Sequence, residues 1–366
     1  MAVATETTSV LANPLTLPCG HTIPNRIIKG AMTEQLSDAE NRPTEELIRL
    51  YERWGRGGTG VLLTGNVMVD RRSLEGPRNV AVENEDDLAQ LTQWAERAQA
   101  NGSELWMQIS HPGRQTPRGV SSQVIAPSAV RIEKKSIKGM FAPPREMTVD
   151  DIHEVIARFA TTARVAKKAG FKGVQIHGAH GYLNSQFLSP LVNKREDDWG
   201  GTPEKRMRFL LEVFRAVRTE VGADYPISVK LNSADFQRGG FTEEDSMNVV
   251  KALEAEGLDL LEISGGNYES PMMINSGEVG KPRESTSKRE AFFLDYAKKV
   301  RGVTDVPLML TGGLRSVSVM EEIVEGGDVD CVGLARPLAV DPDFSKKAIR
   351  HEIEVSPPYK VNLGLG

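Results

Sequence analysis

Eight short apolar runs, each followed by a stretch with helical periodicity, recur along the chain. Apolar character that is continuous rather than alternating is typical of strands buried on both faces, as in a parallel sheet. The runs are Arg26–Gly30, Val61–Thr64, Glu104–Ile109, Gly173–His177, Pro226–Leu231, Leu260–Ser264, Pro307–Thr311 and Asp330–Gly333. Eight strand–helix units without an internal repeat motif predict a single α/β domain folded as a (β/α)8 TIM barrel.

Capping patterns mark the starts of several helices between these runs. Thr148 and Thr242 each precede acidic residues, which are favourable in the first turn of a helix. Thr202 is followed by Pro203, a residue that suits the first helical position. These starts support a regular alternation of strand and helix.

The segments outside the eight units fit one domain, which we expect to comprise residues 1–366. Leu15–Ile23 is typical of a hairpin that caps the N-terminal end of a barrel, and residues 354–366 predict an extended tail. Residues 111–147 are too many for an ordinary connection, so we expect them to form an excursion over the active-site mouth. Residues 178–201 form a second long loop.

The composition argues against several classes of protein. The formal net charge is −5 at pH 7 with acidic and basic residues interspersed, so no basic stripe indicates a nucleic acid or a membrane as partner. The N-terminus lacks the pattern of a signal peptide, and no apolar run approaches the ~20 residues of a membrane span. The only cysteines are Cys19 and Cys331, too few for an iron–sulfur cluster. We expect a cytoplasmic protein with a small-molecule partner, and the oligomeric state stays open.

The most distinctive motif is His-Gly-Ala-His-Gly-Tyr at residues 177–182, at the end of the fourth apolar run. Two imidazoles, on His177 and His180, and the phenol of Tyr182 can together hold an oxygen atom and deliver a proton. A histidine at a strand end more often packs or caps, so the motif indicates catalysis only if other strand ends complete a site. A zinc site is not expected, because the sequence places no third ligand nearby.

Strand ends are where the active sites of such barrels lie. In this chain these positions are held by Met32, Thr33, Gly65, Gln108, His177, Lys230, Ser264, Gly312, Gly313, Ala335 and Arg336. After the seventh and eighth runs, glycines with bare backbone N–H groups and an arginine form a pattern typical of phosphate binding. A Gly-x-Gly-x-x-Gly match at residues 55–60 follows a helix and precedes a strand, which is the reverse of a dinucleotide fingerprint.

Three of these side chains allow two interpretations each. Lys230 is either a Schiff-base nucleophile or a fixed cation beside an anionic ring. Gln108 can donate and accept hydrogen bonds, as a heterocyclic amide edge requires, or it is satisfied by backbone groups. Thr33 can donate a hydroxyl hydrogen bond to a ring carbonyl or cap the segment that follows it.

These residues carry a resemblance to the Old Yellow Enzyme family, the FMN-dependent ene-reductases. The resemblance runs over nearly the whole chain, from Asn25–Thr33 to Gly333–Pro337. Its most specific stretch is Ile176–Pro190, together with Asp197–Gly201 and Arg206–Phe209. A combination of this length is far more specific than a single short motif.

The resemblance implies FMN across the barrel mouth and NAD(P)H as the reductant. The FMN phosphate would lie on Gly312, Gly313, Ala335 and Arg336, and the ring among Met32, Thr33, Gly65, Gln108 and Lys230. The substrate would be an α,β-unsaturated carbonyl compound. His177 and His180 would bind its carbonyl oxygen, reduced FMN would deliver hydride, and Tyr182 would be the proton donor.

The chain departs from the family pattern at three positions. Thr33 stands where one subgroup has a redox-tuning cysteine, and Ala335 stands where glycine is common. Lys230 replaces the arginine of many members, which exchanges a planar fork for a compact point charge. Two alternatives remain open: a Schiff-base lyase or aldolase that uses Lys230, and a non-catalytic flavin-binding protein.

Overall fold

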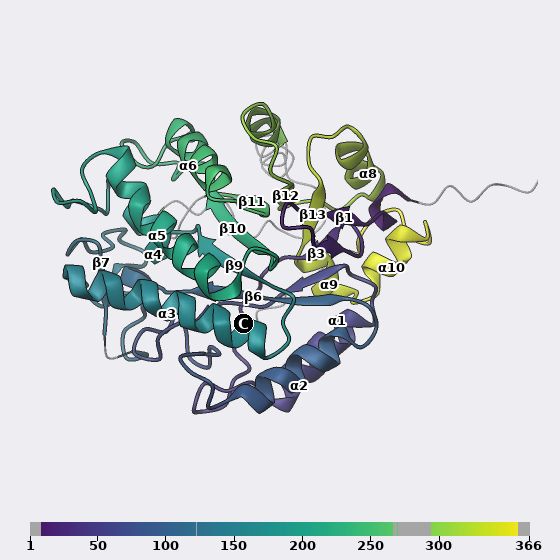
Figure 1. Cartoon of the computed structure of the whole chain (residues 1–366), viewed down its shortest axis with the longest axis horizontal. Helices are drawn as coiled ribbons and strands as arrows, with labels where there is room; N and C mark the ends of the chain where they lie inside the picture. The colour runs from purple at the N-terminus through teal and green to yellow at the C-terminus, as the bar shows by residue number, and fades with distance from the viewer. Residues whose placement is uncertain (1–8, 122, 266–268, 270–293, 358–366) are drawn as a thin grey trace, which may run out of the picture.

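The computed structural model describes residues 9–121, 123–265, 269 and 294–357 (Figure 1). Eight parallel strands form a closed barrel, in which β13 pairs with β3 and β4 pairs with β6. In barrel order the strands are β3 (Ile27–Lys29), β4 (Val61–Leu63), β6 (Glu104–Ser110), β9 (Gly173–Gly178), β10 (Ile227–Asn232), β11 (Leu260–Ser264), β12 (Leu308–Thr311) and β13 (Cys331–Leu334). Each strand overlaps one of the eight predicted runs, so the predicted TIM barrel is confirmed.

Helices pack around the outside of this barrel (Figure 1). They are α1 (Glu45–Gly55), α2 (Leu88–Gln99), α3 (Val149–Lys168), α4 (Leu183–Leu188), α5 (Pro203–Val221), α6 (Glu243–Ala255), α8 (Val317–Glu325), α9 (Arg336–Val340) and α10 (Phe344–Ile349), and residues 294–301 are also helical. Capping boxes begin α3 and α6 at Thr148 and Thr242, and Pro203 opens α5. The predicted helix starts are therefore confirmed.

Alternation along the strands divides the apolar core into an outer and an inner part. Ile27, Leu62 and Leu105 belong to the large cluster that packs against the helices. Ile28 and Trp106 belong to a smaller cluster inside the barrel. Side chains two residues apart share a face of a strand. The next inward-facing positions along each strand therefore lie nearer the mouth of the barrel.

A hairpin closes the N-terminal end of the barrel. It consists of β1 (Leu15–Thr16) and β2 (Thr22–Ile23), which pair antiparallel. Leu17 and Ile23 join the inner apolar cluster. Two polar contacts fasten the hairpin, from the Cys19 backbone N–H to Asp259 Oδ1 (2.9 Å) and between His21 Nε2 and Glu104 Oε1 (2.8 Å).

The long stretch at residues 111–147 has local structure of its own. It contains β7 (Ile125–Ala126) and β8 (Arg145–Glu146), which pair with each other, and short 3-10 turns at Gly113–Gln115 and Lys138–Met140. Gln115 Nε2 donates to the backbone carbonyl of His180 (3.0 Å). The stretch therefore reaches the end of β9, at the mouth of the barrel.

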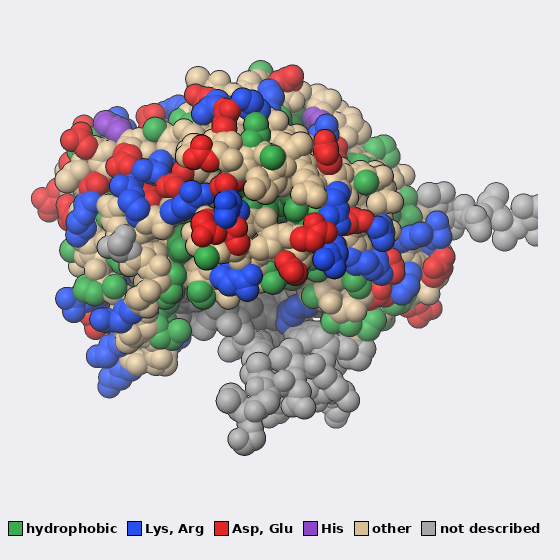
Figure 2. Space-filling view, turned by 90° about the horizontal axis from the view of Figure 1, so that it is seen from below, with side chains coloured by type: hydrophobic (Ala, Val, Ile, Leu, Met, Phe, Trp, Pro, Cys, Tyr) green, Lys and Arg blue, Asp and Glu red, His purple; other side chains and the backbone are tan. Residues whose placement is uncertain are grey.

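The described part of the predicted tail ends at residue 357. Val355 pairs with Ser316 in an isolated antiparallel bridge, and residues 358–366 of the predicted tail lie outside the described residues. Acidic and basic side chains are interspersed over the face seen in Figure 2. None of the helices in the described ranges has the length and apolar character needed to cross a bilayer.

Candidate active site

The motif at the end of β9 folds into a compact cluster of rings. The ring of His177 lies 5.1 Å from the ring of His180 and 4.8 Å from the ring of Tyr182, measured between centroids. His180 and Gly181 have φ angles of 61° and 77°, in the left-handed region that reverses the chain sharply. This turn brings the three predicted side chains together.

Both imidazoles are held in their neutral form. Burial, the neighbouring imidazole and the charge of Lys230 lower the pKa of His177 well below its usual value. Burial and the charge of Lys230 do the same to the pKa of His180. The Ala179 backbone N–H donates to His177 Nδ1 (3.2 Å), which leaves the ring proton on Nε2. His177 can therefore act as an uncharged N–H donor.

His180 is fixed by two further contacts. Its Nε2 lies 2.7 Å from the Oγ of Ser264, the last residue of β11. Its backbone N–H donates to the Oδ1 of Asn232, the last residue of β10 (3.2 Å). Asn184, on α4, donates to the backbone carbonyl of His177 (3.0 Å). The strand end and the turn after it are thus held by side chains from three other elements.

A chain of polar side chains crosses the barrel below these rings. Gln108 Nε2 donates to Gln175 Oε1 (2.7 Å), and Gln175 Nε2 donates to Glu262 Oε2 (2.9 Å). Glu262 Oε1 forms an ion pair with Lys230 Nζ (2.9 Å). Gln108 and Lys230 were expected at the site from the sequence, and Gln175 and Glu262 were not. Their signal was a polar residue at an inward position of an otherwise apolar strand.

Several groups at the mouth fit FMN. Gln108 Oε1 and Thr311 Oγ1 are buried and have no hydrogen-bond partner among the described residues. An unmatched carbonyl oxygen suits the N–H of a heterocyclic ring. Gly312 and Gly313 follow β12 with φ angles of 132° and 74°. These angles favour glycine, which has no side chain to cover the backbone N–H groups. Ala335 and Arg336 follow the adjacent strand β13. Thr311 was not identified from the sequence.

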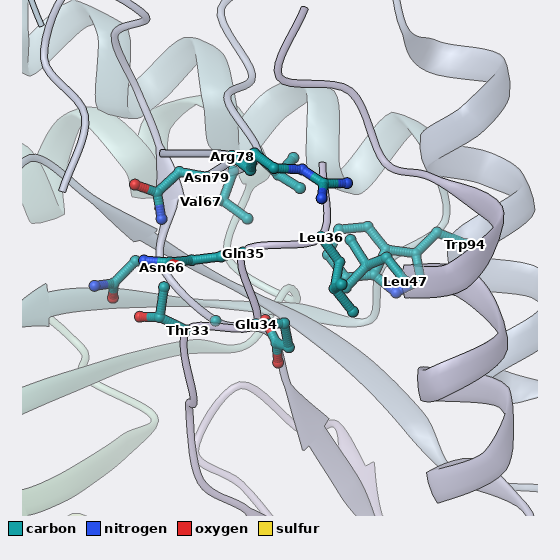
Figure 3. Close-up of a pocket in the computed structure, with 12 residues that line it drawn as sticks. Thr33, Glu34, Gln35, Leu36, Leu47, Asn66, Val67, Arg78, Asn79 and Trp94 are labelled. Carbon is teal, nitrogen blue, oxygen red and sulfur yellow. The ribbon is translucent and has the colours of Figure 1, made fainter. Parts of the chain in front are cut away.

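The ends of β3 and β4 meet at the positions of Met32, Thr33 and Gly65. Thr33 and Gly65 line one small pocket, in which Thr33 lies near Asn66 (Figure 3). A Cβ on Gly65 would come within 2.2 Å of the carbonyl oxygen of Met32. The two loops therefore touch, and only glycine fits at residue 65.

A buried lysine that was not predicted as a site residue contacts these loops from outside the barrel. Lys29 is fully buried, and its Nζ donates to the backbone carbonyl of Leu63 (2.7 Å) and to Tyr51 (3.3 Å). Tyr51 donates to Glu34 (2.5 Å) and accepts from the Gly65 backbone N–H (3.1 Å). Burial, partly opposed by Glu34, lowers the pKa of Lys29 to about 8.

Residues 11–354 match the NADH:flavin oxidoreductase / NADH oxidase family. The chain belongs to this family. The NADH-dependent flavin oxidoreductase iliE of Hypocrea jecorina is 38% identical over 94% of this chain and 90% of its own length. Its counterpart in a Neonectria species is 40% identical over 92% of this chain, which spans 46% of that longer protein. The NADH oxidase of Thermoanaerobacter brockii is 36% identical, and the chain spans 48% of it.

Solved structures agree with this assignment. A 2-naphthoyl-CoA reductase in complex with 2-naphthoyl-CoA superposes with a TM-score of 0.84 at 28% identity, over 95% of this chain and 53% of that one. Morphinone reductase shares the fold with a TM-score of 0.77 at 22% identity, over 97% and 93% of the two chains. The resemblance to the Old Yellow Enzyme family is confirmed, and with it an oxidoreductase that uses FMN and a nicotinamide reductant.

Among the described residues, no group of three or more His, Cys, Asp or Glu side chains is placed to hold a metal ion.

Proposed function

We propose that this flavin-dependent oxidoreductase reduces the activated C=C bond of α,β-unsaturated carbonyl compounds. The observation that carries the proposal is the cluster of His177, His180 and Tyr182 at the mouth of a barrel that also holds the buried cation of Lys230. When bound, FMN supplies the hydride chemistry that no side chain in this cluster can perform. The protein supplies binding, orientation and the proton.

The groups that would hold FMN come from neighbouring strand ends. Gln108, with its unmatched Oε1, would bind the polar edge of the ring, with Lys230 as the adjacent cation. Met32, Thr33 and Gly65 would contact the ring from the β3 and β4 ends. The phosphate would lie on the loops after β12 and β13, at Gly312, Gly313, Ala335 and Arg336.

The two histidines would bind the carbonyl oxygen of the substrate. A neutral imidazole donates a hydrogen bond without carrying a charge into the buried site. Negative charge develops on that oxygen as the β-carbon accepts hydride, so fixed N–H donors stabilise the transition state more than the ground state. His177 is prepared for this task because its Nδ1 already accepts a backbone hydrogen bond.

Tyr182 would then protonate the α-carbon. Its side chain is 5% exposed and its ring lies against His177. A phenol at this position can approach a bound substrate from the protein side while hydride arrives from the cofactor. The proton is replaced from solvent after product leaves.

The ion pair of Lys230 argues against the lyase alternative. A Schiff-base lysine must be neutral to attack a carbonyl carbon. The amine of Lys230 instead forms an ion pair with the buried carboxylate of Glu262, 2.9 Å away. A protein that only stores flavin would retain the phosphate loops but has no use for the three rings at the end of β9.

The proposal is tested with purified protein and its two half-reactions. We expect non-covalent FMN, bleached without air by NADH or NADPH and restored to the oxidised spectrum by 2-cyclohexenone. Bound FAD, or failure to bind FMN on reconstitution, would contradict the cofactor assignment. Flavin that is bleached but never reoxidised by any enone would favour a non-catalytic flavin protein. Borohydride trapping of a carbonyl compound on Lys230 would favour the lyase.

A further inference from the structure

Glu262, a carboxylate at the centre of the barrel, is not among the residues proposed above to contact FMN or substrate. Its side chain is 0% exposed, and that of its partner Lys230 is 5% exposed. A buried charge is tolerated only with a partner and further hydrogen bonds, and Gln175 supplies one of these to Glu262. Glu262 and Lys230 must therefore be considered together as a single buried pair.

The strand register places this pair directly beneath the mouth. Lys230 is level with Glu262 on one side and with His177 on the other, whereas Gln175 is level with Ser228, one inward position nearer the closed end. The carboxylate is thus held from below by Gln175. The charge of Lys230 reaches the mouth, because it contributes to the lowered pKa values of His177 and His180.

Glu262 also determines how the two glutamines are oriented. An ionised carboxylate can only accept hydrogen bonds, so it draws the amide NH2 of Gln175 toward itself. Gln175 then presents its carbonyl to Gln108 and receives the NH2 of that residue. The carbonyl oxygen of Gln108 is left without a partner. The orientation of the acceptor at the mouth is therefore fixed by Glu262, two hydrogen bonds away.

We propose that Glu262 is a positioning and counter-charge residue that sets the midpoint potential of bound FMN by cancelling part of the field of Lys230. This inference rests on the proposed placement of the FMN ring beside Lys230. Reduction adds negative charge to the pyrimidine side of the ring, so a cation there favours the reduced form. A carboxylate behind the cation opposes this effect. The pair gives a lower potential than the lysine alone would give.

The test compares midpoint potentials of FMN-loaded variants, measured by dye equilibration. Glu262→Gln keeps a polar side chain of the same size and removes the charge, and we expect a more positive potential than in wild type. Lys230→Met removes the cation, and we expect a more negative one. Glu104→Gln is the matched control, because Glu104 is a barrel carboxylate paired with His21 at the closed end; its potential should equal that of wild type.

The outcomes distinguish failure of the inference about Glu262 from failure of the proposed FMN placement. If Lys230→Met shifts the potential and Glu262→Gln does not, the inference about Glu262 fails while the proposed function stands. If both variants bind FMN and neither shifts the potential, the ring is not beside Lys230 and the proposed placement fails. Should Glu262→Gln not fold, Lys230→Arg is compared with Lys230→Arg/Glu262→Gln, because both keep a cation at residue 230 and a guanidinium is more weakly hydrated than an ammonium. A more positive potential in the double variant than in Lys230→Arg supports the inference, and an equal one overturns it.

A second readout separates the role of Glu262 in orienting the glutamines from its charge. In Glu262→Gln an amide replaces the obligate acceptor, so the NH2 of Gln175 is no longer held in one direction. We expect the dissociation constant of FMN, measured by fluorescence quenching on the apoprotein, to rise in Glu262→Gln and to stay unchanged in Glu104→Gln. Equal constants in all three proteins would show that Glu262 does not orient Gln108.

Discussion

The two ends of the barrel interior are built from the same strands in opposite ways. On β6, Trp106 fills the closed end, and Gln108, two residues on, faces the mouth with an oxygen that has no partner. On β11, Leu260 belongs to the closed end and Glu262 to the polar chain below the mouth. The closed end is apolar, and its polar fastenings, such as His21 with Glu104, are matched.

The closed end therefore contributes mainly to the stability of the fold, and the mouth contributes mainly to ligand binding. A buried polar group without a partner reduces stability by ~1–3 kcal/mol, so the unmatched atoms at the mouth weaken the ligand-free fold. A ligand that supplies the missing partners recovers that free energy on binding. Among the described residues, the inner apolar cluster at the closed end contains no side chain with such an unmatched atom. Substitutions at the two ends should therefore affect different measurements.

The largest effect is expected at the mouth, from Tyr182→Phe. The change removes only the proton that the phenol would donate, and a general acid typically contributes ~10²–10⁴-fold to a rate. Stopped-flow measurements should show reoxidation of the flavin by 2-cyclohexenone slowed by about this factor, with reduction by NADPH unchanged. If the two half-reactions slow equally, Tyr182 is structural and the mouth is not specialised in this way.

The histidine pair should give the next largest effect. Removal of one donor to a developing oxyanion typically reduces a rate by ~10²–10³-fold. Phenols should bind to the oxidised protein as phenolates between His177 and His180 and produce a long-wavelength charge-transfer band. We expect His177→Ala/His180→Ala to abolish the band while FMN stays bound. A phenol titration that is unchanged in the double variant would refute the role in oxygen binding.

At the closed end, Trp106→Ala should affect stability instead of chemistry. Trp106 is fully buried, and a Cβ on Gly173 would come within 2.5 Å of its ring. Replacing such a side chain by alanine lowers the free energy of unfolding by ~3–5 kcal/mol. Urea unfolding should show this loss, while both half-reactions stay near wild-type rates where the variant is folded. Slowed half-reactions in a variant of normal stability would contradict the division between the ends.

Thr311 and Thr59 offer a smaller and sharper comparison, because one buried hydroxyl is unmatched and the other is matched. Thr311 Oγ1 has no partner, and Thr59 Oγ1 lies 2.8 Å from Ser345 Oγ. Thr311→Val should raise the free energy of unfolding of the FMN-free protein by about 1 kcal/mol and weaken FMN binding. Thr59→Val should lower it by ~1–3 kcal/mol. Calorimetry with and without FMN checks both, and a destabilised Thr311→Val would show that its hydroxyl is satisfied.

The sequence predicted the barrel because each buried parallel strand is a local apolar run. It also located the mouth residues, since a strand end can be recognised within one segment. The partners of Lys230 could not be found in this way. Its pairing with Glu262, and the bracing of Gly65 by Lys29 through Tyr51, depend on which strands and helices become neighbours. Polar residues at inward positions can be recognised in the sequence. The hydrogen bonds and ion pairs between them form only when the barrel closes.

The smallest expected effect concerns pH and distinguishes the two ends by its sign. The hydrogen bond to Glu104 raises the pKa of His21 above its usual value. Protonated His21 therefore stabilises the fold, fully below a pH of about 6.5, the ordinary pKa of histidine. This contribution is lost as the pH rises through the raised pKa. His177 and His180 have lowered pKa values, so their contribution has the opposite sign and is lost as the pH falls.

The difference in free energy of unfolding between wild type and His21→Gln isolates the closed end. We expect wild type to be the more stable at pH 5.5 by less than about 1 kcal/mol, because the pair is partly exposed to solvent. The difference should shrink as the pH rises above about 6.5. Glu104→Gln should remove the same pH dependence. A difference that grows with pH would show that His21 is neutral in the fold and that the closed end is not fastened by a charged pair.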